Sequence, residues 1–307
     1  MANITLPKNY KLLDYKIERK ISTGGFSIVY LGYTKEGAPV AIKEFFPSTL
    51  HLRQKGQIIS FNNIRDERKF NAGLAAFREE MELVSKLKHK NIIEITNYFE
   101  LNGTAYIVMP YEYGMGLNKY IAQRDFIEEQ DVVSIISGIF SAISLLHKNN
   151  IVHLDLKPGN IWLRPNKEPL ILDFGTARIV NDPEAMKKNP PMFTPGYAAP
   201  EQHRQYFEPE KIGYWTDLYG LGTTLYSLLQ KKSLMPADKL IDKNKRVEIV
   251  REQYGLYNKE LLEIVEDLTR LEVIERKRID LDKIIEKINN LKVKNLNLDV
   301  MNKLRFD

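Results

Sequence analysis

The hydrophobic pattern of this chain changes once, near residue 117, and that change limits the folds it can adopt. Before it, stretches rich in Val, Ile, Tyr and Phe are separated by Gly-Gly, Glu-Gly and Asn-Gly turn signals, which is typical of strands. After it, the patterns are amphipathic or broadly apolar at helical spacing. Strands followed by helices predict an α+β fold with a small β-rich lobe and a larger α-helical lobe.

The expected elements follow from these patterns. We expect strands over 15–22, 27–34, 39–46 and 104–111, and helices over 74–88, 131–150, 215–230, 259–271 and 280–291. One helix therefore lies within the β-rich lobe, and its apolar stripe is Leu74, Phe77, Met81, Val84 and Leu87. The expected organisation is an N-terminal extension (1–14), a two-lobed domain (15–290) and a C-terminal tail (291–307). Within the domain we expect a small lobe (15–109) with an insert at about 44–73, a hinge (110–116) and a larger lobe (117–290).

Composition excludes several classes of protein. The 45 basic and 40 acidic residues are interleaved, so the net charge of +5 predicts a solvated surface and no nucleic-acid partner. The absence of cysteine excludes disulfides and thiolate metal sites, and the five scattered histidines do not suggest zinc. No apolar run approaches the roughly 18–20 residues of a membrane helix, and the start lacks a secretion signal. We therefore expect no membrane partner and a cytoplasmic location, with secretion into a host cell left open.

Three separate stretches suit a phosphate ligand. Gly24 and Gly25 in "ISTGGFSIVY" can bring backbone N–H groups close to phosphate oxygens, although a Gly-Gly turn alone is more often a hairpin. Lys43 ends the apolar stretch "VAIK", where the plainer interpretation is a surface lysine. Asp173 follows a strand in "LDFG", and a carboxylate there can hold a hard cation such as Mg²⁺.

Together with "HLDLKPGN", these stretches resemble the signature set of the eukaryotic-like serine/threonine protein kinases, in the order that family requires. "VAIK", "HLDLKPGN", "LDFGTA" and "TPGYAAPEQ" occur in register, from about Tyr15 to about Asn290. The "HLD" variant of the catalytic loop and an "EFFPS"-like stretch resemble bacterial members. The resemblance implies the bilobal protein kinase fold and transfer of the γ-phosphate of ATP to protein hydroxyls, with ATP and Mg²⁺ required.

The resemblance assigns roles by position. Asp155 would orient the substrate hydroxyl and accept its proton, and Lys157 would neutralise the transferring phosphoryl group. Lys43 would steady the α- and β-phosphates and pair with Glu80, while Glu79 faces solvent. Asn160 and Asp173 would hold Mg²⁺. Thr194 begins the platform that receives a polypeptide substrate. Asp217 would cap the catalytic-loop backbone, and Glu201 would be a buried carboxylate paired with Arg278 or, as second choice, Arg276.

The adenine and phosphate contacts follow in the same way. Met109 would gate the back of the pocket, Pro110 would contribute its carbonyl, and the N–H of Glu112 would donate to adenine. Val29 and Ala41 would cover the base. The phosphate-binding turn departs from the family pattern, because serines replace its first and third glycines; its residues are Ser22, Gly24, Gly25 and Ser27.

Two further departures concern regulation. Leu154 stands where many kinases carry an arginine that pairs with a phosphate on the activation segment, so we expect activity that does not depend on such a switch. The alternative is that Arg178 takes the phosphate. The insert at 44–73 is longer than the family usually places there, and it is either a hairpin packed on the small lobe or a docking element for a regulatory partner that biases the Glu80 helix.

Two other functions remain to be distinguished. A pseudokinase scaffold would bind nucleotide without chemistry, but its expected signature is the loss of Lys43, Asp155, Asn160 or Asp173, and all four are present. A small-molecule phosphotransferase of kinase-like fold would seldom keep a peptide platform such as "TPGYAAPEQ". The sequence therefore favours an active protein kinase acting on Ser or Thr.

Overall fold

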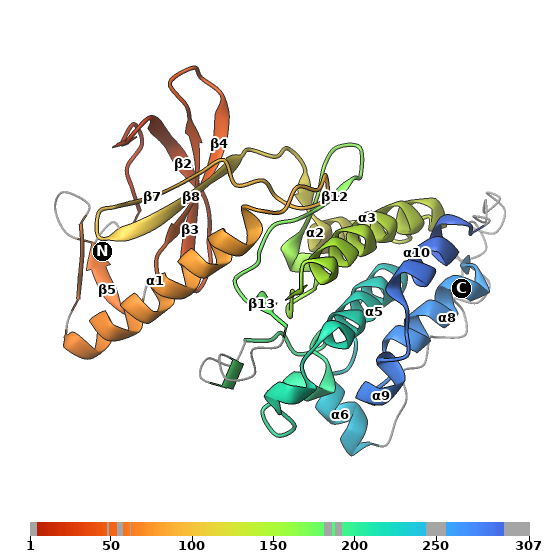
Figure 1. Cartoon of the computed structure of the whole chain (residues 1–307). Helices are drawn as coiled ribbons and strands as arrows, with labels where there is room; N and C mark the ends of the chain where they lie inside the picture. The colour runs from red at the N-terminus through yellow and green to blue at the C-terminus, as the bar shows by residue number, and fades with distance from the viewer. Residues whose placement is uncertain are drawn as a thin grey trace. The chain divides into compact units, whose positions relative to one another are not determined.

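The computed structural model describes residues 5–47, 49–53, 58–61, 63–180, 186–187, 192–243 and 256–291. The chain divides into two compact units: a small unit, Met1–Lys88 with Ile93–Tyr113, and a large unit, His89–Ile92 with Gly114–Asp307. The expected α+β class is confirmed, because the small unit is built on a sheet and the large unit on helices (Figure 1). The boundary between the units lies inside the segment 110–116.

The small unit contains a six-stranded antiparallel sheet in the order β1-β2-β3-β4-β8-β7. All four expected strands are present, and β1 and β7 extend the sheet at its edges. The bounds are β1 Lys11–Leu12, β2 Tyr15–Thr23, β3 Ser27–Tyr33, β4 Pro39–Phe45, β7 Asn97–Leu101 and β8 Thr104–Pro110.

The two faces of this sheet differ in burial because side chains alternate along each strand. On one face, Tyr30 and Ile42 are fully buried. On the other, Val29, Ala41 and Lys43 are only half-buried. This second face is therefore partly accessible around Val29 and Ala41.

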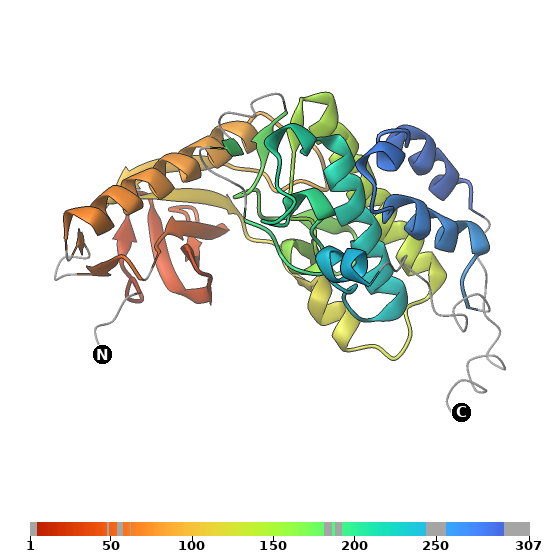
Figure 2. The same ribbon diagram turned by 90° about the horizontal axis from the view of Figure 1, so that it is seen from below.

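The insert folds onto the small unit in its described part. β5 (His51–Arg53) and β6 (Ile59–Phe61) form a hairpin, and the N–H of Ile59 donates to the carbonyl of Asn102 in the β7–β8 turn. α1 (Ile64–Val84) starts well before the expected position at residue 74, because Asn63 caps it and Phe70 continues its apolar stripe. The helix runs along one side of the sheet (Figures 1 and 2). These contacts favour a packed hairpin as the interpretation of the insert.

The large unit is organised around α3 (Glu129–Lys148) and α5 (Tyr214–Gln230), both of which bury a broad apolar face. Within the described part of the chain, α3 is the one helix long and apolar enough to cross a membrane, and half of that stretch is buried inside the structure. It contacts α5 and α10, as expected for a core helix (Figure 1).

Short elements complete the large unit and carry the loops of the site. Its helices are α2 Leu117–Ala122, α6 Ala237–Asp242, α8 Lys259–Leu268, α9 Val273–Arg276 and α10 Leu281–Asn289. Its strands are β9 Met115–Gly116, β10 Ile151–Val152, β11 Ile161–Leu163, β12 Pro169–Ile171 and β13 Arg178–Ile179. Its 3₁₀ turns are η1 Pro158–Asn160, η2 Pro200–Gln202 and η3 Pro209–Lys211. The predicted tail lies outside the described residues except for Leu291.

Candidate active site

Three side chains of the large unit form a closed polar triangle. Two of them, Asp155 and Lys157, lie in the loop between β10 and η1, and the third is Thr194. Lys157 Nζ donates to Asp155 Oδ2 and to Thr194 Oγ1, each at 2.6 Å. Thr194 Oγ1 in turn donates to Asp155 Oδ1 at 2.8 Å. Thr194 comes from a loop almost forty residues away in sequence. The structure therefore brings together a carboxylate, a cation and a platform hydroxyl that the sequence could only relate by family pattern.

Asn160 and Asp173 suit a hard cation by their donor atoms. The amide nitrogen of Asn160 donates to the backbone carbonyl of Asp155 at 2.8 Å and to its Oδ2 at 3.0 Å, which leaves the amide oxygen for a ligand. The N–H of Leu172 donates to the carbonyl of Asn160 at 3.0 Å, so Asp173 follows directly on a segment tied to η1. Amide and carboxylate oxygens are ligands that Mg²⁺ accepts, so these residues fit that ion.

The backbone of the catalytic loop is held by one buried carboxylate. Asp217, on α5, accepts from the N–H of His153 and from the N–H of Leu154, both at 2.8 Å. Leu154 has a φ of +66°, in the left-handed region that costs a non-glycine residue about 1–2 kcal/mol. The expected capping role of Asp217 is thereby confirmed, and it offsets backbone strain next to Asp155.

Two residues that sequence reasoning missed support the same loop. Gln202 Nε2, in η2, donates to the carbonyl of Leu154 at 2.7 Å. His147 Nε2 lies 3.0 Å from Asp217 Oδ2, and its ring packs on Tyr214 with centroids 4.8 Å apart. Neither residue gives a signal in the sequence, because each acts through a partner far away along the chain.

The side chain of Leu154 is part of an apolar cluster. It is 3% exposed and packs with Val152, Val180, Met186 and Ile212. Met186 belongs to the segment that follows "DFG". An ionic contact is therefore replaced at this position by apolar packing between the catalytic loop and that segment. Arg178, the alternative phosphate receptor, donates from Nη1 to the carbonyl of Ala177 at 2.8 Å.

His153 is fully buried and packs against Phe174 in a tilted arrangement, with ring centroids 5.1 Å apart. Burial lowers the pKa of His153, although Asp217 and Asp155 act in the opposite direction. The Nδ1 atom of the ring accepts from the N–H of Asp155 at 3.3 Å. This contact adds a further fixed point to the backbone at Asp155.

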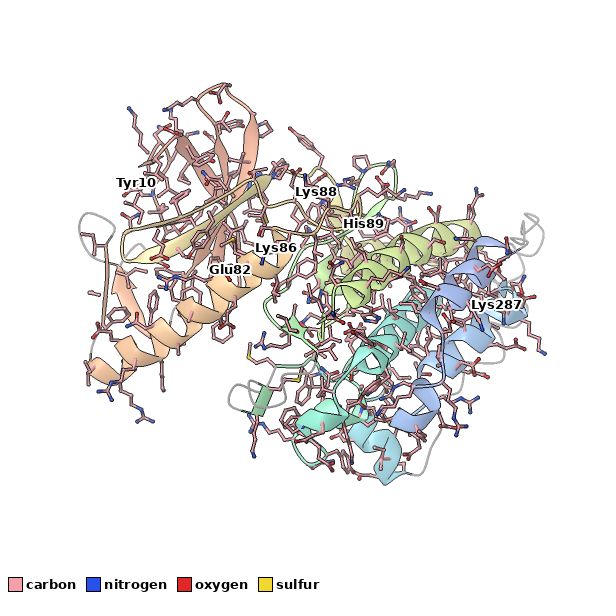
Figure 3. All side chains as sticks on the ribbon, in the orientation of Figure 1. Tyr10, Glu82, Lys86, Lys88, His89 and Lys287 are labelled. Atoms are coloured by element: carbon pink, nitrogen blue, oxygen red, sulfur yellow. The ribbon has the colours of Figure 1, made fainter. Side chains whose placement is uncertain are left out.

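In the small unit, Lys43 and Glu80 form the expected pair. Lys43 Nζ donates to Glu80 Oε1 at 2.7 Å, and both side chains are largely buried. Glu79 and Glu82 on either side of Glu80 are exposed, and Figure 3 labels Glu82 on the same helix. The prediction that Glu80, and not Glu79, faces the lysine is confirmed.

The phosphate-binding turn and the adenine face lie in the same unit. The N–H of Gly24 donates to the carbonyl of Ser27 at 2.8 Å, so this amide is used by the turn itself. Ser22, Gly24 and Gly25 are exposed, and a side chain at Gly25 would meet no atom within 4 Å. The turn therefore has open space around it.

Cross-strand pairing gathers the residues predicted to contact adenine. Ala41 pairs with Met109, Val40 with Pro110, and Val29 with Lys43. Met109 is buried and Glu112 is half-buried. Their contacts to a nucleotide stay predictions.

The partner of Glu201 differs from the first expectation. Arg276 Nη2 donates to Glu201 Oε1 at 2.7 Å and to Oε2 at 2.5 Å, with both side chains buried, whereas Arg278 is exposed. The preference for Arg278 was therefore wrong. The reason is that two residues two positions apart in a helical turn point about 200° apart, so Arg276 faces inward while Arg278 is exposed.

Comparison with known proteins agrees with this geometry. The model of the protein kinase domain family matches residues 15–295. The serine/threonine-protein kinase PrkC of Bacillus subtilis (strain 168) is 32% identical over 219 residues, which is 70% of this chain and 30% of that protein. The probable serine/threonine-protein kinase PknB of Lactococcus lactis is 29% identical over 217 residues, covering 70% and 31%. The chain thus aligns with about a third of each of these relatives.

A solved structure gives the same result. The structure described as PpkA-294 apo form superposes with a TM-score of 0.81 at 27% identity, covering 93% of this chain and 99% of that one. The similarity therefore includes both units and not only the short motifs.

Proposed function

The chain belongs to the protein kinase family, and we propose that it is a serine/threonine protein kinase of bacterial type that transfers the γ-phosphate of ATP to protein hydroxyls. The observation that carries the proposal is the triangle of Asp155, Lys157 and Thr194. Phosphoryl transfer needs positioning and charge stabilisation more than covalent help, and this triangle supplies both.

Each residue then has a chemical role in the proposed reaction. Asp155 orients the hydroxyl of the substrate and accepts its proton, while Lys157 offsets charge on the transferring group. Lys43, held by Glu80, contacts the α- and β-phosphates. Asn160 and Asp173 would hold Mg²⁺, whose charge offsets that of the phosphates.

We also propose that activity does not depend on a phosphate on the activation segment. The apolar cluster around Leu154 supports it, because a phosphate placed there would be desolvated without a guanidinium to bind it. After treatment with a phosphatase and removal of that phosphatase, the enzyme should have the same turnover rate as the untreated enzyme. A large loss after this treatment would contradict the proposal.

A direct test uses the purified chain, labelled ATP with Mg²⁺, and a generic protein substrate. We expect label on Ser and Thr, and none with Asp155→Asn. Transfer that persists in Asp155→Asn would refute the assigned role of this carboxylate. Nucleotide binding without transfer by the wild type would favour the pseudokinase scaffold, and label on small molecules alone would favour the phosphotransferase.

The wider setting also remains a proposal. Protein substrates follow from the family, and the absence of cysteine fits the reducing environment of the cytoplasm. A regulatory partner at the insert 44–73 stays a prediction, as does the absence of nucleic-acid and membrane partners. Cofractionation of the tagged chain with cell contents would check the location.

A further inference from the structure

The residue two positions after the catalytic lysine makes contacts that ATP chemistry does not use. The side chains of Lys43 and Phe45 lie on the same face of β4, because side chains alternate along a strand. Phe45 is 4% exposed, and its ring packs against Phe70 and Phe77 of α1 at centroid distances of 5.0 and 5.6 Å. Phe61, from the hairpin, packs on Phe70 at 5.0 Å. This aromatic group joins β4, the insert and the helix that carries Glu80.

The contact is close because α1 has a glycine where it meets the ring. A Cβ atom at Gly73 would lie 2.7 Å from Cζ of Phe45, whereas ordinary contacts of this kind are 3.4–4 Å. Glycine within a helix costs about 1 kcal/mol relative to alanine. The residue therefore disfavours the helix on its own and is explained by the short distance between α1 and β4.

β4 is fixed more firmly than the helix at this point. Thr104 Oγ1 donates to the carbonyl of Phe45 at 2.6 Å. The buried carboxylate of Glu44 accepts from the hydroxyls of Tyr30 and Tyr106, both at 2.8 Å. The ring of Phe45 is itself restrained by its contacts with Phe70 and Phe77, so a side chain at Gly73 would displace α1 more readily than the strand.

Displacement of α1 would reach the catalytic pair. Glu80 is seven residues after Gly73, about two helical turns, and lies on the same face. Restoring an ordinary contact distance at residue 73 requires a shift of about 1 Å, because 2.7 Å must become 3.4–4 Å. The same shift would take the 2.7 Å contact between Lys43 and Glu80 beyond hydrogen-bonding distance.

We propose that Phe45 and Gly73 are positioning residues whose close packing sets α1 at the depth where Glu80 binds Lys43. The pair acts through Glu80 and does not itself touch substrate. The inference rests on the proposed function, since it requires the Lys43–Glu80 pair to serve ATP turnover. It also gives the insert a function within this chain, because Phe61 packs on Phe70, which in turn packs on the Phe45 ring.

The proposal can be tested by enlarging the side chain at residue 73 and reducing the one at residue 45. Gly73→Ala should lower kcat by about 10- to 100-fold, the range for a misplacement near 1 Å, with KM for the protein substrate unchanged. Its melting temperature should fall only modestly, because the gain of about 1 kcal/mol in helix propensity offsets part of the overpacking cost of about 1–3 kcal/mol. Adding Phe45→Leu, which removes the clashing Cζ atom, should recover most of the lost turnover. Ala72→Ser, on an exposed position of α1, should match the wild type.

A second arm shows whether the effect passes through Glu80. In a Glu80→Ala background, Gly73→Ala should cause less than a twofold further loss, since the acceptor for Lys43 Nζ is already absent. Full additivity would overturn the proposal, as would a Gly73→Ala enzyme within twofold of the wild type. If Gly73→Ala does not fold, Phe45→Leu alone should lower kcat at least fivefold, and unchanged turnover would overturn the inference.

The failure of the proposed function is distinguishable from the failure of this inference. A wild-type chain without transferase activity refutes the former. In that case, amide hydrogen exchange over residues 74–84 gives the readout. It should be faster in Gly73→Ala and return to the wild-type rate with Phe45→Leu added. Unchanged exchange in both variants would refute the positioning role.

Discussion

Replacement of Arg276 by methionine should be among the most destabilising single substitutions in the large unit. The Arg276 side chain is 0% exposed and that of Glu201 is 1% exposed. Besides the two contacts to Glu201, the guanidinium donates to the carbonyls of Trp215, Arg270 and Leu271. Methionine fills a similar volume but satisfies none of these acceptors.

The expected cost follows from what remains buried. Removing one partner of a buried ion pair costs about 3–5 kcal/mol, because the other charge is left uncompensated. The carbonyls left without a donor add to this, so we expect a loss of at least about 4 kcal/mol in the free energy of unfolding. Arg278→Met is the matched control, since Arg278 is exposed, and it should change stability by less than about 0.5 kcal/mol.

The assay is urea unfolding followed by intrinsic fluorescence, with midpoint and slope both recorded. Arg276→Lys keeps the charge but loses the planar fork, so it should fall between the wild type and Arg276→Met and remains measurable if the latter does not fold. In Glu201→Gln, the further effect of Arg276→Met should be much smaller than in the wild type. Equal midpoints for Arg276→Met and Arg278→Met would refute this reasoning.

Three further predictions concern the site. Lys43→Ala and Asp173→Ala should each lower phosphoryl transfer by at least about 100-fold with little change in melting temperature, and retained turnover in either would contradict its role. Asp217→Asn should cost about 2–3 kcal/mol in urea unfolding and lower kcat, because an amide cannot accept from every N–H group that the carboxylate binds; unchanged stability would count against the capping role. Burial lowers the pKa of His89 and of His153, so below about pH 6.5 the unfolded chain binds protons that the folded chain does not, and stability should fall as pH decreases. His89→Asn should flatten this dependence between pH 7.5 and 5.5, and an unaltered slope would contradict it.

Most of the fold could be predicted because its signals are local. The strands β2, β3, β4 and β8 have alternating or continuous apolar patterns bounded by turn residues, and the structure has them close to the expected bounds. The start of α1 was missed because the stretch from Ile64 to Gly73 is polar except for a few positions. Its N-terminus depends on the Asn63 cap and on aromatic contacts with β4.

The candidate site divides in the same way. Side chains that lie in one short motif, such as Asp155 and Asn160, could be named from the sequence, and the structure places them in contact, while their roles stay predictions. The choice of Arg278 over Arg276 was wrong, because the sequence does not show which side of a four-residue helix faces the core. The packing of Phe45 on Gly73 was equally inaccessible, since a distance between two distant segments leaves no pattern in either.

The left-handed backbone of Leu154 has a consequence for how this position can evolve. Its φ of +66° favours glycine or asparagine, while the surrounding cluster favours a large apolar side chain. The backbone conformation and the packing at position 154 therefore favour different residue types. We expect position 154 to covary among relatives with Val152 and Met186, so that an arginine at 154 is accompanied by smaller or polar residues at those two positions.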